Sequence, residues 1–68
     1  MNTKDARIVA YTWHGLRRYS AMSGSVHLGP ARTTMLVALS DAHIKGTKPE
    51  KVYDTDRGVS VPIEEWKE

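Results

Sequence analysis

Residues that build hydrophobic cores are scarce in this chain. Leucine, isoleucine and valine supply only 13 of its 68 positions, and phenylalanine is absent. A chain of this length is near the size at which a single core is marginally sufficient for folding. No cysteine is present, so disulfides cannot add stability. We therefore expect one small domain over residues 7–66 with a thin core, a disordered N-terminus at 1–6 and a mobile tail at 67–68.

The side chains that usually carry chemistry do not form a recognisable set. His14, His27 and His43 have no zinc-site spacing, and no cysteine could complete one. Neither a nucleophile elbow nor a phosphate-cradling glycine loop occurs. A chain this small could hardly enclose a water-excluding cleft. We expect no catalytic residue, no metal, no cofactor and no enzymatic activity.

The apolar runs are short. The longest, from Met35 to Leu39, has five residues, against about 20 needed to span a bilayer. The first residues carry charges at Lys4, Asp5 and Arg7 and lead into no apolar segment, unlike a secretory signal. We expect a cytoplasmic protein, in the bacterial host cytoplasm if it is viral, with no membrane partner.

Strand patterns occur near both ends of the chain. Residues 7–13 are rich in β-branched and aromatic types and contain neither glycine nor proline. Residues 51–53 and 59–63 flank a polar loop that ends in Gly58, which predicts a β-hairpin. Pro62 cannot donate to a ladder, so its strand should lie at a sheet edge. A further short strand is expected over residues 26–28.

The middle of the chain predicts the main helix, over about Pro30–Lys45. Proline suits the first helical position, and Gly46 suits the position just past the end. The competing interpretation is a strand over residues 33–39, which are rich in β-branched types. Residues 16–22 are expected to form a helical turn or two, because apolar side chains recur there at a spacing of three.

Together these elements predict an α+β fold. The helix should pack on a short antiparallel sheet made by the first strand and the C-terminal hairpin. The order of the strands cannot be determined from the sequence.

The candidate binding residues gather in one basic and aromatic cluster. Guanidinium groups beside aromatic rings suit phosphates, unstacked bases and acidic protein surfaces. Trp13 also has a purely structural interpretation, as a large filler for a core without phenylalanine. The predicted partner-binding residues are Trp13, His14, Arg17, Arg18 and Tyr19, with Arg7 and Tyr11 from the preceding strand.

The C-terminal segment has a second candidate. Trp66 either folds back as a hydrophobic plug on the hairpin or stands exposed as a docking anchor beside Glu64 and Glu65. Exposed tryptophan is a frequent interface hot spot, since it buries a large area at little cost in rotamer entropy. The segment is therefore a possible secondary docking site.

In size and composition the chain is similar to small bacteriophage-encoded proteins that bind host machinery. The resemblance implies a non-enzymatic regulator that contacts a large nucleic-acid machine, host RNA polymerase above all, by steric protein–protein contact. The alternative is direct binding of single-stranded RNA or DNA by Tyr11, Trp13, Arg17, Arg18 and Tyr19 on a sheet face. A structural component that folds fully only as an oligomer is a third possibility, and the oligomeric state stays open.

Overall fold

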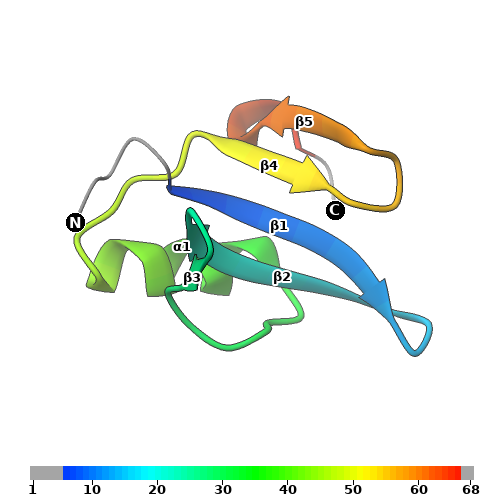
Figure 1. Cartoon of the computed structure of the whole chain (residues 1–68), viewed down its shortest axis with the longest axis horizontal. Coiled ribbons are helices and arrows are strands. Elements are labelled where there is room, and N and C mark those ends of the chain that lie inside the picture. The colour runs from blue at the N-terminus through cyan, green and yellow to red at the C-terminus, as the bar shows by residue number, and fades with distance from the viewer. Residues whose placement is uncertain (1–5, 67–68) are drawn as a thin grey trace.

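The computed structural model describes residues 6–66 and has two layers, a five-stranded sheet and one helix on one of its faces (Figure 1). The predicted α+β class is therefore confirmed. The elements are β1 (Ala6–Trp13), β2 (Leu16–Ser23), β3 (Val26–His27), α1 (Met35–Ile44), β4 (Lys51–Asp54), β5 (Val59–Pro62) and the 3₁₀ turn η2 (Ile63–Glu65).

The sheet has the strand order β3-β2-β1-β4-β5. Neighbouring strands are antiparallel except β1 and β4, which run parallel from Ile8↔Val52 to Ala10↔Asp54. The sheet is therefore mixed, not wholly antiparallel as expected. The parallel pair arises because the chain crosses through α1 before it returns to the sheet beside β1, and such a connection brings the next strand back in the same direction.

β2 corrects the expectation of a helical turn over residues 16–22. A two-residue turn at His14 and Gly15, with φ values of 52° and 76°, reverses the chain after β1. Positive φ at both central positions matches the twist of a tight hairpin. Every β2 residue then pairs with β1, from Trp13↔Leu16 to Ala6↔Ser23. The strand pairing outweighs the weak helical pattern.

The helix begins at Met35, five residues later than the sequence predicted. Before it, the backbone of Arg32 exchanges two 2.7 Å hydrogen bonds with Tyr19 of β2, which holds this segment extended beside the sheet. Thr34 is the N-cap and accepts a hydrogen bond from the Val37 backbone N–H. A sheet contact and a threonine cap therefore override proline as the start signal.

The core lies between α1 and the sheet. Alanines supply many of its contacts, which lets the helix approach the strands closely, and the predicted thin core is confirmed. The buried apolar residues are Ala6, Ile8, Ala10, Tyr19, Ala21, Leu28, Met35, Ala38, Ala42 and Val52, with Leu39, Ile63 and Trp66 packed at the edge.

The C-terminal hairpin agrees with its prediction. β4 pairs with β5 from Lys51↔Pro62 to Asp54↔Val59, Gly58 has a φ of 68°, and β5 lies at the sheet edge. Ala6 is buried in β1, so the folded domain includes one residue that was assigned to the N-terminal tail. Residues 1–5 and 67–68, the rest of the two predicted tails, lie outside the described residues.

Candidate functional site

Strand alternation gives the sheet two different faces. Ile8 and Ala10 of β1 face α1, so Arg7, Val9, Tyr11 and Trp13 point to the opposite side. We call this side the open face. By the strand registers its positions are Arg7, Val9, Tyr11, Trp13, Leu16, Arg18, Ser20, Met22, His27, Lys51, Tyr53, Ser60 and Pro62.

The open face combines cations with exposed rings. Arg7, Arg18 and Lys51 are its basic residues, and its strand positions carry no carboxylate. Trp13 is 60% exposed, and Tyr53 is also exposed. The local charge is therefore positive, although the whole chain has a net charge of only +2.

The distal part of the β1–β2 hairpin carries the densest group of these side chains. β4 pairs with β1 only as far as Ala10, so the hairpin extends beyond the end of β4 (Figure 1). A hollow of about 460 Å³ on it is lined by Tyr11, Trp13, Arg18 and Ala31. Ala31 lies there because the neighbouring Arg32 is bridged to β2.

Trp13 does not fill the core, so that structural interpretation is wrong. Its ring lies on the open face, with an edge-on contact to the His14 ring at a centroid distance of 4.7 Å. Tyr19, which is 3% exposed, is the large aromatic filler of the core. The reason is register, because Tyr19 pairs with Ala10 and shares its face.

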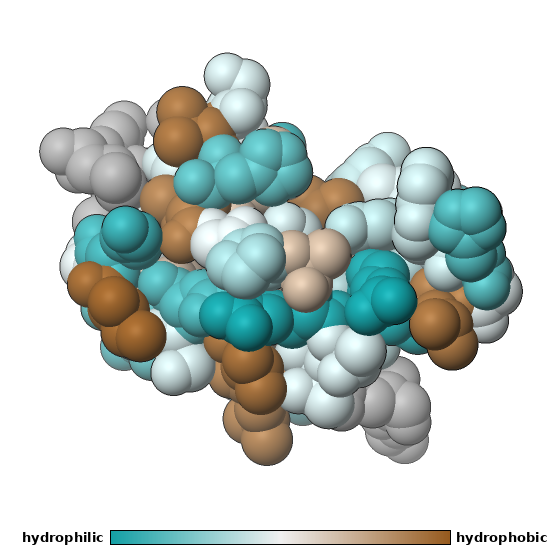
Figure 2. All heavy atoms as spheres, turned by 90° about the horizontal axis from the view of Figure 1, so that it is seen from below, coloured by the Kyte–Doolittle hydropathy of each residue, from teal (hydrophilic) through white to brown (hydrophobic). Residues whose placement is uncertain are grey.

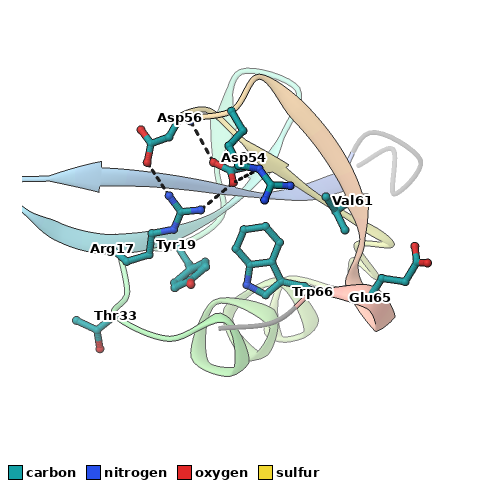
Figure 3. Close-up of a pocket in the computed structure, with 9 residues that line it drawn as sticks. Arg17, Tyr19, Thr33, Asp54, Asp56, Val61, Glu65 and Trp66 are labelled. Atoms are coloured by element: carbon teal, nitrogen blue, oxygen red, sulfur yellow. Dashed lines mark hydrogen bonds and ion pairs between the residues drawn. The ribbon is translucent and has the colours of Figure 1, made fainter.

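Arg17 lies on the opposite face from Arg18 and is held by two carboxylates (Figure 3). Its guanidinium is 2.9 Å from the buried Asp54 carboxylate and 2.6 Å from Asp56. Thr12 also donates to Asp56 at 2.6 Å, and Arg57 lies 3.5 Å from Asp54. Arg17 is therefore a structural cation that joins β2 to the loop after β4.

The pKa values of this ion pair follow from its surroundings. Burial raises the pKa of Asp54. The hydrogen bond and charge of Arg17, together with the backbone N–H groups of Asp56 and Arg57, lower this pKa by more than burial raises it, so the net pKa lies below the ordinary value. For Arg17 the signs are reversed. Burial lowers its pKa, and the hydrogen bond and charge of Asp54 raise it, so the net pKa lies above the ordinary value. The pair stays ionised at neutral pH.

Trp66 agrees with the plug interpretation. Its half-buried ring packs edge-on against Tyr19 at 6.0 Å, and the Arg17 guanidinium lies 5.5 Å from its centroid (Figure 3). Its indole Nε1 is buried without a hydrogen-bond partner. Glu64 and Glu65 are exposed in η2.

The structure therefore divides the predicted cluster. Trp13, Arg18, Tyr11 and Arg7 share the open face, His14 lies in the turn, and Arg17 and Tyr19 face the helix side. Tyr53, Lys51 and Leu16 join the open face and were missed. The alternation of Lys51 and Tyr53 in the predicted hairpin could have indicated their common face, but not that β4 lies beside β1.

A second surface lies on the solvent side of α1. Leu36 is 76% exposed and Ile44 is 77% exposed, with Val37 also exposed beside them. From below, the side on which α1 lies in Figure 1, apolar groups project at separate points with hydrophilic side chains between them (Figure 2). We call Leu36, Val37 and Ile44 the helix stripe.

Within residues 6–66, no group of three or more His, Asp or Glu side chains is placed to hold a metal ion. The one α-helix in this part of the chain has ten residues, and none of its helices is long and apolar enough to cross a membrane. Comparisons with protein-family models, curated proteins and solved structures each found no match. The functional argument therefore depends on the fold and the site alone.

Proposed function

We propose that this protein is a non-enzymatic binding module that holds single-stranded nucleic acid on the open face. The observation that carries the proposal is the segregation of side chains by the sheet, because exposed rings and three cations share a face whose strand positions lack carboxylates. Such a face attracts a polyanion and offers its bases something to stack on.

The binding mechanism divides between rings and cations. Trp13 and Tyr11 offer stacking surfaces to unpaired bases, each stack contributing about 1–3 kcal/mol. Arg7, Arg18 and Lys51 neutralise phosphates, and the release of counterions favours binding at low salt. Arg17 takes no part, since Asp54 and Asp56 already neutralise it.

The direct test is anisotropy of a labelled nine-nucleotide oligouridylate with wild type and Trp13→Ala. The exposed Trp13 contributes little to stability, so its loss should leave thermal unfolding nearly unchanged and weaken binding by about fivefold or more. Leu36→Ala, which also removes an exposed apolar side chain but lies on α1, is the matched control and should bind as wild type. Absence of saturable binding, or equal affinity for Trp13→Ala and wild type, would contradict the proposal.

The helix stripe favours a second candidate function, regulation of a nucleic-acid machine by protein contact. Large exposed apolar side chains gathered on one surface are typical of protein-docking sites, and Leu36, Val37 and Ile44 are all exposed on one short helix. The resemblance to small bacteriophage proteins makes host RNA polymerase in the bacterial cytoplasm the proposed partner. The effect would be steric, by occupying a surface or channel.

This candidate is tested with purified bacterial RNA polymerase immobilised on a biosensor. The pair Leu36→Ser and Ile44→Ser should reduce binding by tenfold or more, while Val26→Ser, another exposed apolar position, should leave it unchanged. No binding by wild type would remove the candidate, and unchanged binding by the double variant would remove the role of the helix stripe.

A further inference from the structure

The hollow on the distal hairpin has a distinct hydrogen-bonding character. It is lined by Tyr11, Trp13, Arg18 and Ala31 and has a volume of ≈ 460 Å³, within the range of about 300–1,000 Å³ typical of small-ligand sites. Two of its four residues have aromatic rings, so the hollow offers flat apolar surfaces to a planar group. Trp13 and Arg18 come from adjacent strands, and Tyr11 pairs directly with Arg18.

The polar side-chain atoms of the hollow are mostly donors. A guanidinium has five N–H donors and no acceptor, and the indole of Trp13 has a donor alone. The Tyr11 hydroxyl can both donate and accept. The carboxylates of β4 and the loop after it belong to Asp54 and Asp56. Both are ion-paired with Arg17 on the helix side of the sheet. The lining therefore favours a planar ligand with adjacent acceptors.

Guanine presents two adjacent acceptors, N7 and O6, on one edge of its double ring. Cytosine also has an adjacent acceptor pair, N3 and O2, but on a single ring that offers the rings of Trp13 and Tyr11 a smaller area for stacking. Adenine presents an amino donor beside N7, which Arg18 cannot accept, and the two carbonyls of uracil flank an N–H. The planar fork of arginine matches the N7 and O6 pair with two parallel hydrogen bonds. A lysine at the same position could not make both.

We propose that this hollow is a guanine pocket, in which Arg18 binds N7 and O6 of one unstacked guanine against the rings of Trp13 and Tyr11. The inference rests on the proposed function, because it assigns a base preference to the same face. The rest of a bound strand is held without regard to sequence, through phosphates and stacking.

The test compares nine-nucleotide strands that differ only at the central base. Oligouridylate with one central guanosine should bind about tenfold more tightly than the strands with central adenosine or uridine, as expected for one bidentate pair. It should also bind more tightly than the strand with central cytidine, whose single ring stacks over a smaller area. A central 7-deazaguanosine removes N7 alone and should abolish most of this preference in the wild-type protein. Arg18→Lys should reduce the ratio of guanosine to adenosine affinity to near one, with Arg7→Lys as the matched control that keeps the ratio.

The outcomes separate this inference from the proposed function. Equal affinity for all four strands, or a preference for adenosine or cytidine, overturns the guanine pocket and leaves single-strand binding intact. No saturable binding of any strand overturns both. Full preference for guanosine by Arg18→Lys, or for 7-deazaguanosine by wild type, overturns the role of the guanidinium fork. Thermal unfolding of each variant shows whether a loss comes from misfolding.

Discussion

At the scale of single residues, Asp54 is the side chain with the strongest constraint on its charge. It is one of the largest fully buried side chains and is ion-paired to Arg17 at 2.9 Å, while one oxygen accepts from the Asp56 backbone N–H. Asp54→Asn keeps the size but loses the charge, and should reduce the free energy of unfolding by about 1–3 kcal/mol. Urea unfolding measures this. Asp56→Asn is the exposed control and should cost less than about 1 kcal/mol.

The lowered pKa of Asp54 also fixes the sign of a pH dependence. Because its folded pKa lies below the ordinary value of about 4, its contribution is complete at about pH 5 and above, and it is lost as the pH falls below the ordinary value and through the folded pKa. Stability should therefore fall between about pH 5 and pH 3, and less steeply in Asp54→Asn. Asp41, whose pKa is lowered by its hydrogen bond with Arg32, accounts for a remaining slope. If the stability of wild type and of Asp54→Asn fell equally steeply with decreasing pH, the result would contradict this account.

The roles of individual aromatic residues could not be determined from the sequence. Trp13 and Tyr19 are both large rings in the same cluster, yet one is exposed and the other is buried. Their fates depend on the hairpin register, which fixes the face of each strand position. Arg17 and Arg18 also look equivalent in the sequence, as long as the turn at His14 and Gly15 is not known. In the structure, only Arg18 lies on the open face.

At the scale of elements, local signals predicted the parts of the chain that depend least on tertiary contacts. The first strand, the C-terminal hairpin and the end of the helix before Gly46 were all confirmed. The predictions for the start of α1 and for residues 16–22, which form β2, were wrong. Both depend on backbone pairing with a strand that is distant in the sequence or on the far side of a turn. The bridge between Tyr19 and Arg32 is such a contact, and no local pattern indicates it.

The β1–β2 turn gives a prediction at this scale. Gly15 has a φ of 76°, and a Cβ added there would meet no atom within 4 Å, so the cost of Gly15→Ala is purely conformational. We expect a loss of about 1–2 kcal/mol in stability, since a left-handed conformation is unfavourable with a side chain. His14→Asn should instead raise the melting temperature, because asparagine before glycine suits this turn. Thermal unfolding followed by circular dichroism measures both effects. If Gly15→Ala had the same stability as wild type, the result would argue against the turn.

At the scale of the whole molecule, the sheet separates charges that the composition alone leaves mixed. The two layers place Asp41 and Asp54 on the helix side, each paired with an arginine, while Arg7, Arg18 and Lys51 lie on the open face. Binding of a single strand by three cations predicts a slope of about −2 when the logarithm of the association constant is plotted against that of salt concentration. Anisotropy titrations at several salt concentrations measure it. A slope near zero would exclude phosphate contacts.

The most direct measurement is an NMR titration of the ¹⁵N-labelled protein with a nine-nucleotide single strand. Shift changes of the backbone amides should concentrate on the open face, at Tyr11, Trp13, Arg18 and Tyr53, while Leu36 and Ile44 of α1 keep their positions. Changes centred on α1, or no change at strand concentrations well above that of the protein, would contradict the assignment of binding to the open face.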